Sequence, residues 1–315
     1  MKKIFFVGHL RSSFVRNDYE GLKKYFKLRL YAPNLFDIVK NMIWCDTVLG
    51  WFASYRMVIP TILAKILNKK IVVIAGGYDV VYAPEIDYGA FIRPKEKRIS
   101  KFVFKHADIV LPVSDYIKNE LLEKVTPKQV ELIYNGVDIN KFYPYGDKCD
   151  KLVITVGEIN WSNLKRKGIA HFVKAAKYVP EAQFVVIGQF KDDAIDYLRK
   201  IATPNVSFTG FVTDEELLTW YQVAKVYAQL SYHEGFGLSV AEAMLCECIP
   251  VVSNRGALKE VAGKSDSLYG DPKFAAACIK SALRENSDRG KFARWRIAFN
   301  FSLLDRIERL RMVLR

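Results

Sequence analysis

The first half of the chain alternates short apolar runs with longer segments whose apolar residues recur at helical spacing. The apolar runs are rich in β-branched residues, have the length of buried strands, and cover residues 4–7, 47–49, 71–75 and 109–113. The helical patterns between and after them cover residues 19–26, 58–67, 95–105 and 115–124. Ser114 stands where it can cap the last of these helices. A regular alternation of strand and helix is typical of a parallel sheet with helices packed on its faces.

A second series of the same kind follows. Its predicted strands cover residues 152–156, 184–187, 206–208, 226–229 and 250–252. Its predicted helices cover residues 167–178, 214–223, 238–245 and 272–283. Between the two series, Asn135-Gly136 and Pro144-Tyr145-Gly146-Asp147 are turn signals, so we place a domain boundary near residues 145–150. We therefore expect an α/β chain with two doubly wound, Rossmann-like domains, residues 1–148 and 149–298, that face each other across a cleft.

Composition limits the class of protein. At 315 residues the chain is long enough for two domains of roughly 150 residues each. Half of the residues are hydrophobic and 13% are aromatic, which excludes global disorder. No apolar run approaches the ~18 residues of a membrane-spanning helix. The apolar start of the chain is too short for a signal peptide and predicts a first strand instead, so we expect a soluble, cytoplasmic protein.

Charge and cysteine usage narrow the partners further. The formal net charge of +14 fits nucleic acid, an anionic membrane surface or a polyanionic substrate. The basic residues are spread over several elements and form no recognisable nucleic-acid-binding motif, so no nucleic-acid partner is expected. The five cysteines are scattered, and the four histidines form no spaced cluster. We expect buried free thiols and no structural metal.

The densest group of chemically suggestive residues follows the predicted strand 226–229. Gly235 and Gly237 let the backbone pass close to a ligand, and a helix predicted to begin near Leu238 directs its free N–H groups there. This combination is typical of a phosphate site. Glu234 and Glu242 flank it, and carboxylates repel phosphate but accept hydrogen bonds from sugar hydroxyls. One carboxylate is suited to a ribose diol and the other to a hexose diol, and the alternative is an ordinary surface helix after a glycine-rich turn.

The phrase from Glu234 to Glu242 resembles the Glu-seven-residues-Glu signature of the family-4 retaining glycosyltransferases, which have the GT-B fold. The resemblance extends over nearly the whole chain. Further matching phrases lie at residues 135–138, 142, 144, 156–157, 167–168, 205–212, 216–217, 221, 250–253 and 260–261. Each match is modest alone, and their order along the chain makes the resemblance specific.

The resemblance implies roles for the matching residues. Glu234 would hold the donor sugar, Glu242 the ribose hydroxyls, and Lys167 would neutralise the diphosphate. The other donor-binding candidates are Gly235, Phe236, Gly237, Leu238 and Ser239 through their backbone, Phe211 and Val212 beside the base, and Gly8 after the first predicted strand.

The chain departs from the family pattern at two places. Glu158 follows Gly157 where the family usually has arginine. Arg166 is a candidate to supply the missing guanidinium from a longer loop, and the alternative is a solvated basic turn. In the first domain, Gly76-Gly77-Tyr78-Asp79 replaces the family's His-Gly-x-Asp. Asp79 either faces the acceptor or sugar, or is a turn aspartate.

The expected function is transfer of a sugar from a nucleoside-diphosphate sugar, with retention, to a glycan, lipid-linked or small-molecule hydroxyl. We assign the catalytic roles to Glu234, Lys167, Arg166 and Asp79. No metal and no cofactor are expected, because the cations and the helix end near Leu238 stabilise the departing diphosphate. The alternatives are a GT-B sugar-nucleotide epimerase and a non-catalytic basic binding protein.

Two expectations concern surfaces. Residues 299–315 are predicted to form a helix that packs back on the first domain, because apolar residues at 303, 307, 310 and 314 form one stripe. Residues 19–27 and 93–105 mix basic and aromatic side chains. They are either a face that docks reversibly on anionic lipid at the cytoplasmic side of a membrane, or solvated helix surfaces.

Overall fold

The computed structural model describes residues 1–263 and 270–315. The chain divides into two compact units. Unit 1 consists of Met1–Gly136 together with Leu303–Arg315, and unit 2 consists of Val137–Ser302.

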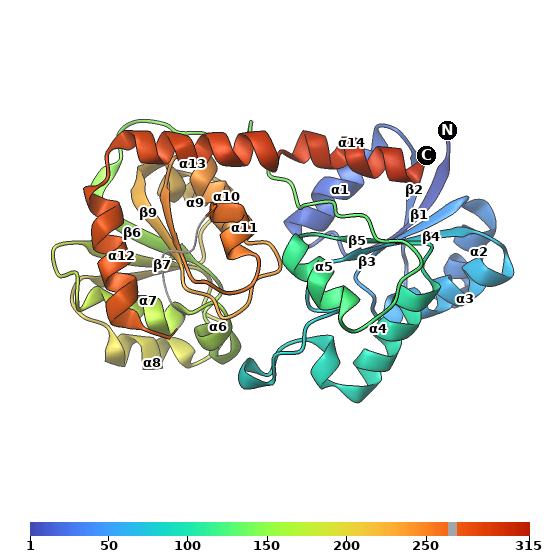
Figure 1. Ribbon diagram of the computed structural model, residues 1–315, viewed down its shortest axis with the longest axis horizontal. Helices are drawn as coiled ribbons and strands as arrows, with labels where there is room; N and C mark the ends of the chain where they lie inside the picture. The colour runs from blue at the N-terminus through green and yellow to red at the C-terminus, as the bar shows by residue number, and fades with distance from the viewer. Residues whose placement is uncertain (264–269) are drawn as a thin grey trace. The chain divides into compact units, whose positions relative to one another are not determined.

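Unit 1 is built on a parallel sheet with the strand order β2-β1-β3-β4-β5 (Figure 1). Its strands are β1 (Lys3–Val7), β2 (Lys27–Leu30), β3 (Thr47–Trp51), β4 (Lys70–Ala75) and β5 (Ile109–Pro112). Its helices are α1 (Ser13–Lys23), α2 (Leu35–Trp44), α3 (Val58–Ile66), α4 (Pro94–His106), α5 (Asp115–Leu122) and α14 (Leu303–Leu314), with the short 3-10 helices η1 (Tyr55–Met57), η2 (Pro84–Ile86) and η3 (Ala90–Ile92).

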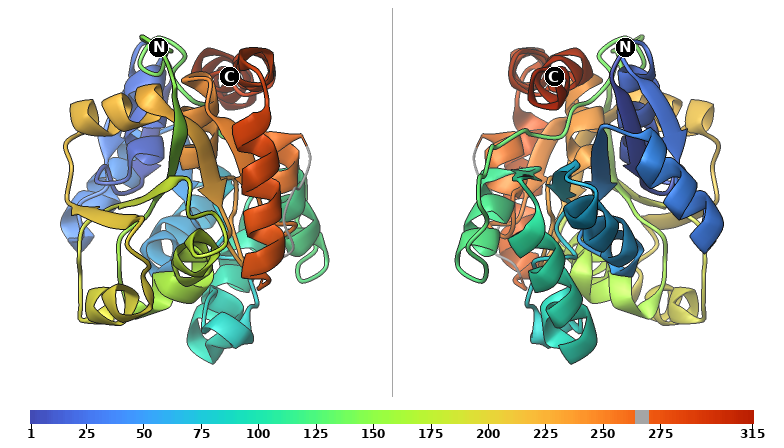
Figure 2. Two further views of the ribbon diagram at one scale, coloured as in Figure 1. Left: turned by 90° about the vertical axis from the view of Figure 1, so that its left-hand side faces the viewer. Right: turned by 90° about the vertical axis from the view of Figure 1, so that its right-hand side faces the viewer.

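The helices of unit 1 cover both faces of its sheet (Figure 2). Right-handed crossovers place α1 on one face and α2, α3 and α4 on the other. On that second face α3 contacts both α2 and α4. On the first face α14 contacts α1. Because both faces are covered, the central strands are apolar throughout rather than alternating, and all of Ile71–Ala75 in β4 is buried.

Helix α14 ties the end of the chain to unit 1. It begins at Leu303 rather than at residue 299, because Phe301 and Ser302 break the helical path. Most of its predicted apolar stripe is buried, namely Ile307, Leu310 and Leu314. Arg306 of α14 forms a buried ion pair with Asp18 of α1, with 2.7 Å between Nη2 and Oδ2.

Unit 2 carries a second parallel sheet, with the strand order β10-β9-β6-β7-β8. Its strands are β6 (Cys149–Val156), β7 (Gln183–Ile187), β8 (Val206–Gly210), β9 (Ala224–Gln229) and β10 (Ile249–Val252). Its helices are α6 (Trp161–Arg166), α7 (Ile169–Ala176), α8 (Ala194–Ile201), α9 (Asp214–Val223), α10 (Leu238–Leu245), α11 (Leu258–Ala262), α12 (Pro272–Arg284) and α13 (Ser287–Asn300).

The boundary between the units lies earlier than residues 145–150. Unit 2 begins at Val137, whose N–H donates to the carbonyl of Phe301 at 2.9 Å. The ring of Phe142 packs edge-on against Tyr221, with 6.1 Å between ring centroids. The turn signals therefore mark a connection inside unit 2, and not its start.

Each sheet has a point where the strand order reverses, between β1 and β3 in unit 1 and between β6 and β9 in unit 2. In doubly wound sheets, ligands bind beyond the carboxyl ends of the strands at such a point.

Among the described residues, no helix combines the length and the apolar character needed to cross a bilayer.

Candidate active site

The loops that follow β6 and β9 bring two candidate residues into contact. Lys167 is the C-cap residue that follows α6, in the connection from β6 to α7, and Glu234 lies between β9 and α10. The Nζ atom of Lys167 is 3.0 Å from Oε1 of Glu234, and both side chains are largely buried. This ion pair stands at the point where the strand order of unit 2 reverses.

Backbone contacts hold these two loops together. The carbonyl of Arg166 accepts a hydrogen bond from the N–H of Tyr232 at 2.8 Å. Gly168 has φ +69°, and a Cβ at this position would stand 1.8 Å from the carbonyl oxygen of Leu230. Only glycine therefore permits the close approach of the two loops, which sets the position of Lys167.

A chain of buried polar side chains leads from β9 to Glu234. The hydroxyl of Tyr227 donates to Gln229 Oε1 at 2.8 Å, and Gln229 Nε2 donates to Ser231 Oγ at 2.7 Å. Ser231 Oγ in turn donates to Glu234 Oε1 at 3.4 Å. Tyr227, Gln229 and Ser231 were not among the predicted site residues, although three polar or hydroxyl-bearing positions at strand spacing in an otherwise apolar run are a recognisable signal. These hydrogen bonds link the carboxylate of Glu234 to buried side chains of the core and so help to fix its orientation.

The cations keep Glu234 ionised. Burial alone would raise the pKa of Glu234, but the charges of Lys167 and Arg166 outweigh it and lower the pKa below its ordinary value. Burial also lowers the pKa of the neighbouring His233 to about 4, so its imidazole is neutral at physiological pH. The site thus offers a carboxylate beside fixed positive charge, out of reach of most bulk water.

Arg166 is the last residue of α6, and its charge acts on Glu234 of the ion pair with Lys167. Its Nη2 donates to Oδ1 of Asn163 at 2.6 Å. Asn163 is itself held by a bond from its Nδ2 to the carbonyl of Glu158 at 2.9 Å. Arg166 is therefore oriented by its own helix and is not a freely solvated basic turn.

Glu242 lies on α10 and has a different environment. The hydroxyl of the buried Tyr221 donates to its Oε2 at 3.1 Å. Burial raises the pKa of Glu242, and the bond from Tyr221 and the charge of Lys141 only partly oppose this effect. The two glutamates of the signature are therefore electrostatically distinct.

The segment between the two glutamates presents backbone rather than side chains. Gly237 has φ +96° and precedes the first residue of α10, Leu238. The side chain of Phe236 is buried and packs edge-on against Phe301 at 5.4 Å between ring centroids. Gly235 and Ser239 are half-buried on either side. Free N–H groups at the start of a helix and its dipole suit an anion here.

Phe211 and Val212 lie farther along the sheet. They follow β8, the edge strand, and the side chain of Phe211 is 73% exposed. Three inter-strand steps separate β8 from β9, which is about 14 Å at the usual strand spacing. A ligand that reaches both Phe211 and Glu234 must therefore be extended along the carboxyl edge of the sheet.

The remaining candidates, Asp79 and Gly8, belong to unit 1. Asp79 is buried, and its two carboxylate oxygens accept hydrogen bonds from the N–H groups of Ala53 at 2.9 Å and Gly77 at 3.0 Å. Burial raises the pKa of Asp79 to about 6. These contacts are those of a turn aspartate that holds the loops after β3 and β4. Gly8 follows β1 and lines a cavity of unit 1.

Known structures with the same architecture are glycosyltransferases of the GT-B fold. Sucrose-phosphate synthase from Thermosynechococcus elongatus matches with a TM-score of 0.81 and 16% identity, covering 99% of this chain and 98% of that one. Anabaena HepE, solved in complex with UDP and glucose, matches with a TM-score of 0.80 and 16% identity, covering 100% and 99%. At this identity the likeness shows the fold, and the chain has the GT-B fold.

Sequence comparisons then give the family. The model described as Glycosyltransferase Family 4 matches residues 22–141, and the model described as Glycosyl transferases group 1 matches residues 150–285. An uncharacterized glycosyltransferase of Methanocaldococcus jannaschii is 30% identical over 234 residues, 67% of this chain and 56% of that protein. A D-inositol 3-phosphate glycosyltransferase of Mycolicibacterium vanbaalenii is 25% identical over 258 residues, 71% and 53% respectively. The chain spans little more than half the length of these relatives, and it belongs to the group 1, family 4 glycosyltransferases.

Proposed function

We propose that this glycosyltransferase moves a sugar from a nucleoside-diphosphate donor to an acceptor hydroxyl and retains the anomeric configuration. The ion pair of Lys167 with Glu234 carries the proposal, because it holds a carboxylate suited to sugar hydroxyls beside a cation suited to a diphosphate. The complexes of Anabaena HepE with UDP and with UDP-glucose support a donor of this class.

In this mechanism the donor lies along the carboxyl edge of unit 2. Lys167 and Arg166 face the diphosphate, and the backbone at the start of α10 donates to it. The bond between the anomeric carbon and the phosphate oxygen breaks, and the electron pair leaves with the diphosphate, whose growing charge these groups stabilise. The acceptor oxygen bonds to the anomeric carbon from the same face, and its proton passes to the departing phosphate oxygen.

The two glutamates divide the rest of the donor. Glu234 accepts hydrogen bonds from the sugar hydroxyls and remains ionised beside Lys167. Glu242, oriented by Tyr221, accepts from the ribose hydroxyls. Phe211 offers an exposed ring for the base at the far end of the sheet. Asp79 positions the loops of unit 1 and does not touch the donor.

The transfer is metal-independent in this proposal, because Lys167, Arg166 and the helix end supply the positive charge that a divalent cation would provide. Turnover should survive complete chelation by EDTA. A loss of activity that Mg²⁺ or Mn²⁺ restores would contradict this part of the proposal.

The deciding experiment follows a panel of nucleotide sugars by mass spectrometry, with and without hydroxyl acceptors. Acceptor-dependent formation of a glycoside with the donor's anomeric configuration supports the transferase. Release of an epimer or free sugar without any acceptor would instead indicate an epimerase. Donor left unchanged by the folded protein with every acceptor would indicate a binding protein.

We further propose that the protein binds its acceptor at an anionic membrane on the cytoplasmic side. The face of unit 1 that contacts the membrane would include the predicted segment 93–105 but not residues 19–27. Tyr25 is unsuited to contact lipid, because its hydroxyl donates to Glu308 of α14 at 3.0 Å. The exposed apolar side chains gather instead on α2 and α3, as Leu35, Phe36, Val39, Ile43, Ile59, Ile62 and Ile66. We call these seven residues the α2–α3 face.

Charge complementarity selects the bilayer as the occupant of the α2–α3 face. The neighbouring helix α4, which contacts α3, exposes the cations Lys95, Lys97, Arg98, Lys101 and Lys105. Apolar side chains beside a row of cations suit shallow insertion into a membrane that contains anionic lipid. These cations belong to the predicted basic and aromatic segment 93–105.

A further inference from the structure

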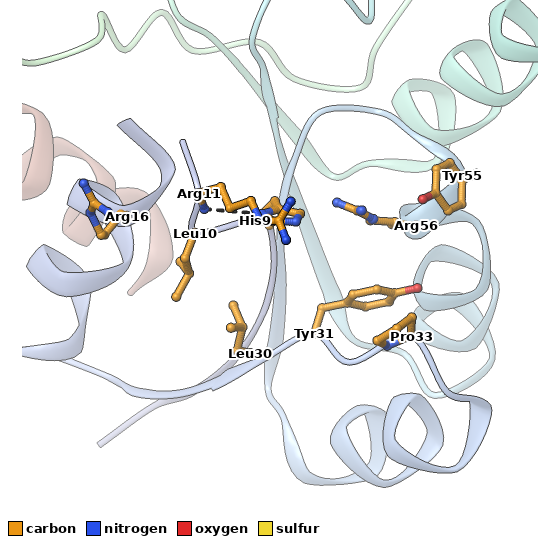
Figure 3. A pocket seen from close by; sticks show the side chains of 10 residues that line it. His9, Leu10, Arg11, Arg16, Leu30, Tyr31, Pro33, Tyr55 and Arg56 are labelled. Carbon is orange, nitrogen blue, oxygen red and sulfur yellow. Dashed lines mark hydrogen bonds between the residues drawn. The ribbon is translucent and has the colours of Figure 1, made fainter. Parts of the chain in front are cut away.

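A second group of basic side chains lies in unit 1, apart from Lys167 and Arg166. A cavity of about 720 Å³ is lined by His9, Arg11, Arg16 and Arg56, with Tyr31 and Tyr55 among the other side chains around it (Figure 3). In Figure 3 the guanidinium of Arg56 extends across the cavity towards His9 and Arg11. Several positive groups thus share one hollow.

The cavity lies where a ligand is expected in this fold. His9 and Arg11 follow β1, Tyr31 follows β2, and Arg56 lies on η1 after β3. These are the carboxyl ends of the strands on both sides of the reversal point between β1 and β3. The cations are therefore gathered by the topology of the sheet, from segments far apart in the sequence.

Among the residues that the structure describes, the guanidinium groups of Arg11 and Arg56 lack the acidic neighbours that Arg306 and Arg311 of unit 1 have. Arg306 pairs with Asp18, and Arg311 pairs with Glu308. Within the described part of the chain, no carboxylate lies within 4.0 Å of the guanidinium groups of Arg11 or Arg56, and no acidic residue lines the cavity. Cations gathered without a counter-charge repel one another, and a bound anion relieves that repulsion.

We infer that this cavity is an acceptor subsite for a phosphate ester, which rests on the proposed transferase function. Two guanidinium groups offer paired N–H donors that match phosphate oxygens. On the other side of the cavity, Leu30, Tyr31 and Pro33 provide an apolar wall for the organic part of the acceptor. The acceptor is thus a molecule that carries both a phosphate group and the hydroxyl that receives the sugar.

The phosphate ester has two sources, a free metabolite or a lipid headgroup. Pro33 lies just before α2, and Arg56 just before α3, so the cavity adjoins the first turns of the helices that carry the α2–α3 face. Both sources present the same chemistry to the arginines, and the probes below separate them.

The test uses the full chain with isotope-labelled histidine, at fixed pH and without nucleotide sugar, and follows the NMR signal of His9. One variant, His9→Gln, assigns that signal among the four histidines. We expect sn-glycerol 3-phosphate to move the signal saturably and glycerol to leave it unchanged. Arg11→Ala and Arg56→Ala should each weaken binding about ten- to a hundredfold. The matched control is Arg309→Ala, an exposed arginine on α14, which should bind as the wild type does.

Dihexanoyl phosphatidic acid below its micellar concentration is the second probe. Tighter binding than glycerol 3-phosphate supports a lipid-linked acceptor, and equal binding supports recognition of the phosphate ester alone. The inference is overturned if neither probe moves the His9 signal, or if the arginine variants bind as tightly as the control. Its failure is separable from that of the transferase proposal, because donor turnover at Lys167 and Glu234 is measured with other acceptors.

Discussion

The ammonium group of Lys167 lies 3.0 Å from the carboxylate of Glu234, and the two residues come from loops that follow neighbouring strands of one parallel sheet. The contact links residues far apart in sequence through the reversal point between β6 and β9. Because Lys167 has three N–H donors, it can hold Glu234 and still donate to a phosphate oxygen. In the proposed mechanism, the pair would connect the sugar end of the donor to the leaving group.

The two glutamates should respond differently to removal of their charge. Glu234→Gln should lower turnover roughly ten- to a thousandfold, because the ring it holds develops positive charge in the transition state. Glu242→Gln should mainly raise the Michaelis constant for the donor, by about 1.5–3 kcal/mol of lost binding, because the ribose does not change during the reaction. Steady-state kinetics separate these effects, with circular dichroism as the check on folding. Wild-type kinetics in both folded variants would contradict both assignments.

Lys167→Ala should lower turnover by about a hundred- to a thousandfold, because the cation that faces the leaving diphosphate is lost. It should also change the pH profile. Burial raises the pKa of Glu234 and Lys167 lowers it, so without the lysine the carboxylate takes up a proton at higher pH. The residual activity should then fall at a higher pH on acidification than wild-type activity does. An acidic limb at the same pH in both proteins would show that Lys167 does not set the ionisation of Glu234.

Much of the sheet architecture could be predicted from the sequence, since buried parallel strands such as β4 are unbroken apolar runs. The segment from β2 to α2 was missed. Strand β2, Lys-Leu-Arg-Leu, lies at the sheet edge with both ends exposed, so its pattern is weak. Helix α2 exposes Phe36 and Ile43 to solvent, which blurs the amphipathic pattern that identifies a helix.

For the candidate site, the sequence identified residue types but not their contacts. The Glu234 and Glu242 phrase is local and recognisable, whereas the partnership of Glu234 with Lys167 depends on the order of the strands. The cavity of unit 1 was not foreseen for the same reason, since Arg11 and Arg56 are far apart in sequence. Asp79 was a catalytic candidate from its match to the family phrase and its position after a strand, with a turn aspartate as the alternative, and its two backbone donors favour that alternative.

Asp79 should make stability depend on pH. Burial raises its pKa in the folded state to about 6, above the ordinary value of 3.8, so the folded protein binds this proton more tightly than the unfolded chain. Its contribution is therefore fully present below about pH 4 and is lost as the pH rises through 6, up to about 3 kcal/mol. The measurement is the free energy of unfolding between pH 4 and 7 in the wild type and in Asp79→Asn. The variant should lack this part of the slope, and equal slopes would remove Asp79 as its source.

The α2–α3 face should direct the protein to anionic vesicles. Ile66 is 72% exposed on α3, and Ile66→Glu places a charge where an apolar side chain would enter the lipid. We expect co-sedimentation of the wild type with vesicles of phosphatidylglycerol and phosphatidylcholine at low salt, and weaker binding as salt rises, because exposed charges are screened. Binding by Ile66→Glu should be at least tenfold weaker. Charge reversal at Lys97 and Lys101 should weaken it as well, and should also reduce its dependence on salt.

The matched control for the membrane experiment is Met312→Glu. Met312 is 66% exposed on α14, outside the α2–α3 face, so a glutamate there changes the net charge equally without entering the lipid. This variant should bind vesicles nearly as the wild type does. Equal losses in Ile66→Glu and Met312→Glu would show that net charge alone governs binding, and equal binding to vesicles of pure phosphatidylcholine would remove the role of the α4 cations. The first result would leave the α2–α3 face without its proposed partner, and the second would show that the face binds a bilayer regardless of its charge.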